Sequence, residues 1–388
     1  MNNIAVVAAC DRNNYGDVLL PVLFKEMLAQ YRQENDYKID VFGLTYSDMT
    51  YMGGNKTRPL YMVDEHYDSV VFVGGEILAA RYVNMFLNLQ EDERVIAQYS
   101  SMASCDYEKC DEECRKVLHG VNDYPWVFYP KNTNQKVFYN AVGGAHRAFS
   151  TKQKKAWERC ISETTMFTVR NNRSQIYFRE ICGIDIDLVP DSAILIKEFI
   201  TEKKYIREEI EQIVKDLGNY ITLQVNKRYG EDREDEIASI INEVYRQFKI
   251  KTILLPIGKA QGHEDAIPLN IIHNSAPIAS VYIYDNSIYE TMYLIRNSML
   301  FVGTSLHGII TAASYSVPHT VLFGEADKTI GFINTWNTTK CQYLEKTEDL
   351  IAYIKSKDIY DFINIDSITS MKYKAKKMFD KEFANIFC

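Results

Sequence analysis

The chain of 388 residues is too long for one ordinary hydrophobic core and suggests two domains. Its 46% hydrophobic and 25% charged residues are typical of a globular protein, and its net charge of -8 argues against nucleic acid as the main partner. No stretch approaches the roughly 18 apolar residues of a membrane span, and no charged-then-apolar leader precedes the first predicted strand. The eight scattered cysteines indicate thiols in a reducing cytoplasm.

Strand-like and helix-like segments alternate along most of the chain, which favours parallel sheets covered by helices. In the first half, apolar runs predict strands at residues 4–9, 39–42, 69–73, 137–142, 165–169 and 187–189. In the second half, similar runs predict strands at residues 220–224, 252–256, 279–283, 299–302 and 320–323. The sequence therefore predicts an α/β protein with two Rossmann-like domains.

The domain boundary is predicted near Ile200, because the chain becomes charge-rich and helical there. This places an N-terminal domain at residues 1–200, a C-terminal domain at 201–345 and C-terminal helices at 346–388. Residues 91–135 break the alternation and are interpreted as an insertion in the first domain. Two such domains facing a cleft, with a C-terminal helix that crosses back, form the GT-B architecture. Ligands of such open sheets bind beyond the carboxyl ends of the strands.

The segment from Arg296 to Gly324 contains the most specific candidate site. An apolar strand is followed by Thr304 and Ser305, which are favourable N-cap residues, and then by a half-buried helix with His307 in its first turn. The amides of a helix N-terminus suit an anion. A titratable imidazole there makes this segment a candidate reaction centre, and a capping or buried structural histidine is the alternative.

Two loops of the first half also follow predicted strands. Asn14, Gly16 and Asp17 open a helix, where backbone amides can hold an anion and the carboxylate can accept a hydrogen bond from a sugar hydroxyl. Gly74 and Gly75 permit close approach of the backbone to a ligand. A helix cap without a ligand and ordinary strand-end glycines are the alternatives. Neither loop matches GxGxxG or a Walker loop, so nicotinamide and P-loop chemistry lose support.

Other polar side chains also follow predicted strands. Arg170 can clamp a carboxylate or phosphate at two points, and its alternative role is a salt bridge to Asp191. His263 and Asp265 lie in a loop that leads into a helix, whose dipole is the simpler reason for an acidic residue. Lys328 adds a positive charge after the last predicted strand.

The insertion carries two further patterns. Cys105, Cys110 and Cys114 lack a clear fourth ligand and match neither zinc-knuckle nor iron–sulfur spacing, so no metal site is predicted. The aromatic run at residues 124–130 can stack on a sugar, but a buried patch beneath the insertion is the favoured interpretation.

Taken in chain order, these segments resemble the polysaccharide pyruvyl transferase family over residues 1–90 and 137–345. The motifs that carry the resemblance are Asn14-x-Gly16-Asp17, Gly74-Gly75, Val169-Arg170-x-x-x-Ser174, Pro190-Asp191-Ser192-Ala193, the loop to Asp265, Leu306-His307-Gly308, Ser316-Val317-Pro318 and Lys328. The block around His307 is the most specific. Two positions depart from the family pattern, because Ser305 stands where members with a well-defined donor site have an arginine, and Glu76 stands where a glycine is usual.

The resemblance implies a GT-B-like fold and the transfer of pyruvate from phosphoenolpyruvate onto a sugar as a ketal. The acceptor would be a cell-surface polysaccharide or its lipid-linked precursor. The N-terminal domain would be the acceptor side and the C-terminal domain the donor side. His307 would be catalytic or a donor ligand, and the other donor-binding residues would be Arg170, Ser305, Leu306, Gly308 and Lys328. Residues at the acceptor or in the cleft would be Asn14, Asp17, Gly74, Gly75, Asp191, His263 and Asp265. No metal and no cofactor beyond the donor substrate are implied.

Two other functions stay open at this stage. One is a GT-B glycosyltransferase that uses a nucleotide sugar, and the other is a non-catalytic relative that binds a glycan. The first is motivated by the GT-B architecture and by Ser305, and the second by the missing arginine, one of two positive charges expected at the donor site. The expected location is the cytoplasm. The sequence does not decide whether the protein contacts the inner face of the cell membrane, what its oligomeric state is, or which sugar is the acceptor.

Overall fold

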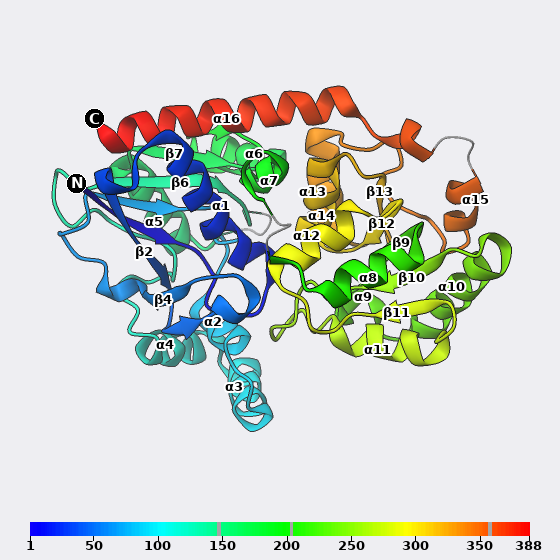
Figure 1. Cartoon of the computed structure of the whole chain (residues 1–388). Coiled ribbons are helices and arrows are strands. Elements are labelled where there is room, and N and C mark those ends of the chain that lie inside the picture. The colour runs from blue at the N-terminus through cyan, green and yellow to red at the C-terminus, as the bar shows by residue number, and fades with distance from the viewer. Residues whose placement is uncertain (146–148, 202–204, 356–358) are drawn as a thin grey trace. The chain divides into compact units, whose positions relative to one another are not determined.

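The computed structural model describes residues 1–145, 149–201, 205–355 and 359–388, and the chain divides into two compact units (Figure 1). The first unit comprises Met1–Asn13, Asp17–Ser192 and Lys374–Cys388. The second comprises Asn14–Gly16 and Ala193–Tyr373. The chain thus changes unit after Ser192, where the sequence predicts a boundary near residue 200.

The first unit is built on a sheet whose described strands number eight, in the order β3-β4-β2-β1-β5-β6-β7-β8. Neighbouring strands pair in parallel, except that β3 and β4 are antiparallel. The central strands are buried apolar runs, as expected for a parallel sheet covered on both faces. The strands are β1 (Asn2–Val7), β2 (Tyr37–Gly43), β3 (Ser47–Asp48), β4 (Lys56–Pro59), β5 (Ser69–Phe72), β6 (Lys136–Val142), β7 (Met166–Val169) and β8 (Asp187–Leu188).

Helices connect these strands, and the predicted insertion contains two of the described helices, α3 and α4. Figure 1 shows α2, α3 and α4 gathered together at one end of the first unit. Asp92 and Asp106 cap the N-termini of α3 and α4 with their side chains. The helices are α1 (Tyr15–Tyr31), α2 (Tyr82–Asn88), α3 (Glu93–Cys105), α4 (Tyr107–Val117), α5 (Thr151–Glu163) and α6 (Asn172–Cys182).

The second unit is built on a parallel sheet of five described strands, in the order β11-β10-β9-β12-β13. The strands are β9 (Tyr220–Gln224), β10 (Lys251–Leu254), β11 (Ser280–Tyr282), β12 (Leu300–Gly303) and β13 (His319–Val321). The helices are α7 (Ile196–Phe199), α8 (Glu208–Leu217), α9 (Lys227–Gly230), α10 (Glu234–Phe248), α11 (Ala266–Ser275), α12 (Ile288–Arg296), α13 (Leu306–Tyr315), α14 (Asp327–Trp336) and α15 (Asp349–Lys355). Because all five strands run in one direction, the loops after them share one edge of the sheet.

The C-terminal helix α16 (Ile365–Phe387) begins in the second unit and returns to the first from Lys374 onwards. Its Phe383 ring packs edge-on against Phe24 of α1, with ring centroids 5.5 Å apart. Glu382, which is fully buried, accepts a hydrogen bond from Asn140 of β6 at 2.9 Å. This confirms the prediction that a C-terminal helix returns to the first unit.

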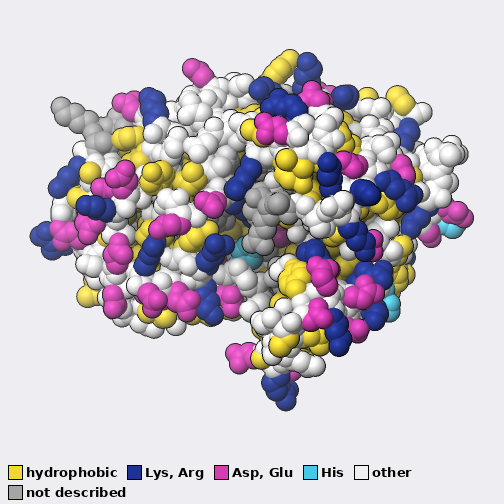
Figure 2. Space-filling view, turned by 180° about the vertical axis from the view of Figure 1, so that it is seen from behind, with side chains coloured by type: hydrophobic (Ala, Val, Ile, Leu, Met, Phe, Trp, Pro, Cys, Tyr) yellow, Lys and Arg dark blue, Asp and Glu magenta, His cyan; other side chains and the backbone are white. Residues whose placement is uncertain are grey.

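The surface carries charges of both signs. Figure 2 shows basic and acidic side chains interspersed over the visible face, in keeping with the modest net charge of -8. Within the described part of the chain, none of the helices combines the length and the apolar content that a bilayer crossing demands.

Candidate active site

The start of helix α13 has the local structure that the sequence predicts. Strand β12 ends at Gly303, and Ser305 has extended backbone angles, φ -76° and ψ 125°. The Ser305 hydroxyl accepts a hydrogen bond from the Gly308 amide at 3.3 Å, which confirms the predicted N-cap. Ser305 therefore stabilises the first turn of the helix that carries His307.

His307 is enclosed by a loop from the opposite end of the sequence. Its side chain is buried, and a Cβ atom on Gly16 would lie only 1.8 Å from its Nδ1. Next to that glycine, Tyr15 Oη lies 2.8 Å from Thr311 Oγ1, and the Thr311 hydroxyl donates to the backbone oxygen of His307 at 2.7 Å. Residues 14–16 belong to the second unit for this reason, and they fix the space that the imidazole occupies.

Gln224, the last residue of β9, fixes the approach to α13. Its Oε1 accepts hydrogen bonds from the amides of Thr304 at 3.0 Å and Ser305 at 2.8 Å. Its Nε2 donates to Asp265 Oδ2 at 2.8 Å. Gln224 is not among the residues predicted from the sequence, although a polar residue that ends an apolar strand, YITLQ, was a usable signal.

Asp265 is an anchor for several loops rather than an exposed cleft residue. It is 1% exposed, and its Oδ2 also accepts hydrogen bonds from the amides of Ile257 at 2.9 Å and Gly258 at 2.8 Å. Burial raises the pKa of Asp265 to about 6, although the hydrogen bonds from these amides and from Gln224 act in the opposite direction. The carboxylate thereby joins the loops after β9, β10 and β12 at one edge of the sheet.

The structure brings other predicted residues to the same edge. Asn14 Nδ2 lies 3.1 Å from His263 Nε2, and Asn14 forms an isolated antiparallel bridge with Gly258. Lys328 is exposed in the first turn of α14, whose neighbouring residue Thr329 donates a hydrogen bond to the backbone oxygen of Thr304 at 2.8 Å. The loops of the second unit therefore hold five of the predicted residues: Asn14, His263, Asp265, His307 and Lys328.

The remaining predicted residues lie in the first unit, where Arg170 is held in a buried cluster of charges. Arg170 is 1% exposed and forms ion pairs with Asp191, at 2.6 Å, and with Glu76. Burial alone would lower the pKa of Arg170, but the two carboxylates raise it on balance. The structure therefore shows the salt bridge to Asp191 that the sequence analysis named as the alternative to a donor clamp.

The glycine loop of the first unit requires its glycines. Gly74 and Gly75 have φ angles of 101° and 93°, in the region that other residues rarely adopt. A Cβ atom on Gly143, at the end of β6, would lie 2.6 Å from Glu76 Oε1. Asp17 is half-buried in the first turn of α1. These residues share the first unit with Arg170 and Asp191.

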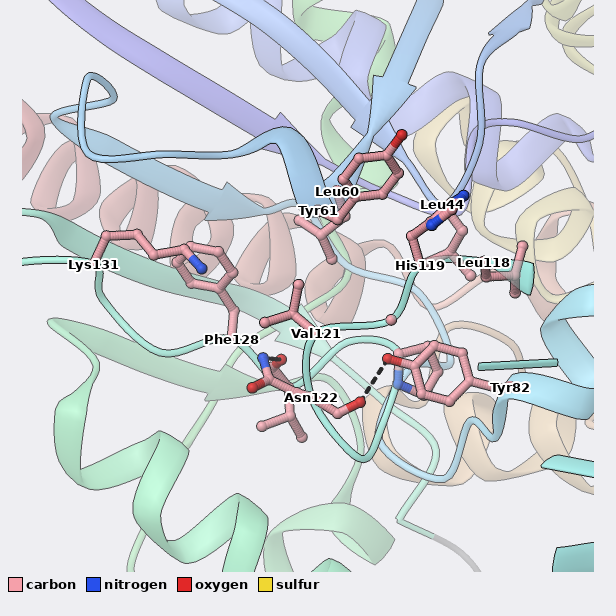
Figure 3. Close-up of a pocket in the computed structure, with 13 residues that line it drawn as sticks. Leu44, Leu60, Tyr61, Tyr82, Leu118, His119, Val121, Asn122, Phe128 and Lys131 are labelled. Atoms are coloured by element: carbon pink, nitrogen blue, oxygen red, sulfur yellow. Dashed lines mark hydrogen bonds between the residues drawn. The ribbon is translucent and has the colours of Figure 1, made fainter. Parts of the chain in front are cut away.

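The aromatic run of the insertion is mostly buried in the core of the first unit. Phe128 lines a small pocket with a volume of about 30 Å³. Figure 3 shows Phe128 and Lys131 on one side of this pocket and His119 and Tyr82 on the other. The Tyr82 hydroxyl donates to the Asn122 backbone oxygen at 2.8 Å. The run therefore contributes mainly to packing, the favoured interpretation of the sequence.

The three cysteines of the insertion differ in environment. Cys110 and Cys114 are buried, and Cys105 is exposed. Among the residues that the structure describes, no group of three or more histidine, cysteine, aspartate or glutamate side chains is arranged to hold a metal ion.

Comparison with known proteins identifies both a family and a fold. A family model described as polysaccharide pyruvyl transferase matches residues 14–322. No curated protein matches the chain.

Several solved structures share its fold. UDP-GlcNAc 2-epimerase from Methanocaldococcus jannaschii has 12% identity and a TM-score of 0.57, covering 99% of this chain and 100% of that one. The enzyme of the same name from Neisseria meningitidis has 11% identity and a TM-score of 0.57, with 99% and 100% coverage. Staphylococcus aureus MnaA, solved with UDP, has 9% identity and a TM-score of 0.55, with 100% and 98% coverage. At these identities the similarity shows the fold alone, which is GT-B-like as predicted.

Proposed function

Because the chain belongs to the polysaccharide pyruvyl transferase family, and is therefore a transferase, we propose that its donor is phosphoenolpyruvate. The product is a pyruvate ketal on a sugar of a cell-surface polysaccharide or of its lipid-linked precursor. The lipid-linked form of the acceptor implies a cytoplasmic enzyme that works at the inner face of the cell membrane. The observation that best supports this proposal is the enclosed histidine at the N-terminus of α13, where a small anion and a proton donor can meet.

The reaction needs one proton donor and no change of oxidation state. A proton is added to the methylene carbon of phosphoenolpyruvate, and a first sugar hydroxyl bonds to the oxocarbenium-like carbon. Phosphate then leaves with the electron pair of its C–O bond, and a second hydroxyl closes the ketal. The two hydroxyls release two protons, of which one balances the proton added to carbon and the other leaves on phosphate.

In this proposal the second unit holds the donor. His307 supplies the proton to the methylene carbon, and the first turn of α13, from Ser305 to Gly308, receives the phosphate. Lys328, exposed in the adjacent α14, supplies the positive charge that the arginine at position 305 provides in other members. We assign Arg170 a supporting role, because its guanidinium already serves two carboxylates. Asn14 and His263 shape the loop beside the histidine.

The donor is tested by ligand-dependent melting together with phosphate release. Phosphoenolpyruvate should raise the melting temperature of the protein, and UDP-sugars should not. Phosphate release should require both phosphoenolpyruvate and a glycan acceptor. His307→Ala should lower that rate by about 100-fold or more, as expected for loss of a general acid. His66→Ala is the matched control, because the His66 side chain is 82% exposed.

Three outcomes would contradict the proposal in different ways. Full activity of His307→Ala would remove the histidine from the reaction. Stabilisation by nucleotide sugars but not by phosphoenolpyruvate would favour a glycosyltransferase. Glycan binding without turnover of either donor would favour a non-catalytic relative. Ser305 is the residue that motivates this alternative.

A further inference from the structure

An open crevice in the second unit lies beside the candidate site and has no role in the chemistry above. It has a volume of about 420 Å³, and its lining includes Arg233, Phe323, Gly324, Glu325 and Tyr343. This volume falls within the roughly 300–1,000 Å³ that small-molecule sites occupy. The crevice is therefore large enough to hold a small molecule.

The crevice lies at the edge of the sheet where ligands of such folds bind. Arg233 lies just before α10, between the two helices that follow β9, and Phe323 and Gly324 are in the loop that follows β13. Strand β12, which leads to His307, lies between these two strands. Since all three strands are parallel, their carboxyl ends share one edge. The crevice is thus a neighbour of the histidine loop within one unit.

Tyr343 presents an aromatic ring in this crevice. It is 39% exposed, and a Cβ atom on Gly324 would lie 3.1 Å from its Cε2, so the glycine leaves room for the ring. The backbone beside the ring is fixed, because the Val321 amide donates to the Gln342 oxygen and the Leu344 amide donates to the Val321 oxygen. The backbone that carries the ring is therefore fixed before any ligand arrives.

A second side of the crevice is formed by an ordered arginine. The Arg233 guanidinium lies over the Phe323 ring, 4.3 Å from its centroid, and pairs with Glu325 at 3.1 Å. The pair with Arg233 lowers the pKa of Glu325, which keeps the carboxylate available as a hydrogen-bond acceptor at neutral pH. A guanidinium beside a carboxylate offers both donors and acceptors to a polyol.

The charges of the lining argue against an anionic ligand. Arg233 and Lys346 are basic, whereas Glu236, Glu325 and Glu345 are acidic, so two positive charges stand against three negative ones. The net negative lining disfavours a phosphate or a carboxylate, and with it phosphoenolpyruvate, as the ligand of this crevice. A pyranose suits it better, because its C–H face can cover an aromatic ring and its hydroxyls can bond to the charged groups.

We propose that this crevice binds a neutral pyranose unit of the acceptor glycan. The inference rests on the proposed function for the identity of the glycan, and it assigns part of acceptor recognition to the second unit. Acceptor contacts are otherwise expected in the first unit, from Asp17, Gly74 and Gly75.

The experiment uses saturation-transfer NMR on the full chain with four neutral disaccharides as probes: lactose, cellobiose, chitobiose and mannobiose. At least one should receive saturation from the wild-type protein. Tyr343→Ala should weaken its binding about tenfold, equivalent to ~1.4 kcal/mol for one aromatic anchor. Tyr343→Phe should retain the binding, because the ring remains. Tyr373→Ala is the matched control, since that tyrosine is 68% exposed elsewhere in the same unit.

Each result separates this inference from the proposed reaction. Absence of binding by all four disaccharides, or binding that Tyr343→Ala leaves unchanged, would overturn the sugar site even if phosphoenolpyruvate is turned over. Disaccharide binding that depends on Tyr343, without turnover of phosphoenolpyruvate, would support the sugar site and count against the donor. Melting curves of each variant distinguish a lost contact from a lost fold.

Discussion

Gly16 is the residue on which the position of His307 depends most directly. A methyl group there would overlap the imidazole, with Cβ only 1.8 Å from Nδ1, so Gly16→Ala must displace the ring. We expect phosphoenolpyruvate-dependent phosphate release to fall by about 100-fold, the cost of misplacing a catalytic group by roughly 1 Å. The measurement is the rate in the phosphate-release assay, with the melting temperature recorded in parallel.

A second glycine serves as the control. Gly331 lies inside α14, and a Cβ atom added there would meet no atom within 4 Å beyond its chain neighbours and the backbone of its own helix. Gly331→Ala should keep wild-type activity and stabilise the helix by about 0.5–1 kcal/mol. Equal activity in the Gly16→Ala and wild-type proteins would show that the ring is not required in its present position.

Gln224 makes a different prediction, because it is needed for structure as well as for the site. Gln224→Met should leave the partly buried Ser305 amide without its acceptor, which costs about 1–3 kcal/mol, whereas the Thr304 amide keeps its 3.3 Å bond to the backbone oxygen of residue 224. Urea denaturation should therefore show a lower midpoint. Gln212→Met, on the exposed side of α8, should change stability by less than about 0.5 kcal/mol. Equal midpoints for the two variants would contradict the role given to Gln224.

At this scale the sequence predicts what is local. The cap at Ser305 and the helical position of His307 follow from neighbouring residues, and both are confirmed. The partners of Gln224 and Gly16 do not follow, because Ser305 lies 81 residues after Gln224 and the histidine comes from the opposite half of the chain. Arg170 shows the same limit, since a strand-end arginine suits a ligand or a salt bridge equally well until its surroundings are known.

Among the elements, α16 carries a buried acid whose titration should affect stability. Glu382 is fully buried in the first unit, and burial raises its pKa from 4.5 to about 8. The folded state thus binds this proton more tightly than the unfolded state, so stability should fall as pH rises from about 4.5 to 8. A pKa shift of this size corresponds to a loss of a few kcal/mol in the free energy of unfolding, and Glu382→Gln should remove that loss. The measurement is the urea midpoint between about pH 5 and 8.

A charge change on the same helix provides the control for that prediction. Lys377→Gln alters the net charge at an exposed position of α16 and should keep the pH dependence of the wild type. If Glu382→Gln also keeps it, another group is responsible for the pH dependence of stability.

The elements that the sequence misses are short or polar. Strands β3 and β4 comprise Ser47–Asp48 and Lys56–Pro59, and neither has the apolar run that identifies the central strands. Helices α3 and α4 are a different case. Their caps, Asp92 and Asp106, were readable signals, but the charged segments behind them resemble loop sequence until α2 packs against them.

For the whole molecule, alternation of strands and helices was enough to predict two Rossmann-like units, and the family match over residues 14–322 agrees with the resemblance drawn from motifs. It was not enough to assign every segment to its unit. Residues 14–16 and the last part of α16 each belong to the unit that is distant in sequence. Only contacts between remote segments decide such membership.

The end of α16 should be essential to the first unit. A variant that stops at Tyr373 loses the rings of Phe379 and Phe383, each of which is buried and packs near Phe24. Their removal exposes Phe24, and exposing a buried phenylalanine costs about 1.5–3 kcal/mol, so this variant should melt at a lower temperature and bind a hydrophobic dye. A variant that lacks only Cys388, which is exposed, should behave as the wild type. Equal melting of the two variants would show that the first unit is complete without this segment.

The membership of residues 14–16 in the second unit has a consequence for exchanging parts between relatives. A chimera joined only at Ser192 would combine the histidine of one parent with the enclosing glycine and tyrosine of the other. A functional chimera has to take this tripeptide and the segment Ala193–Tyr373 from the same parent. During evolution, substitutions in the tripeptide and around the histidine should have been inherited jointly, although most of the chain's length separates them.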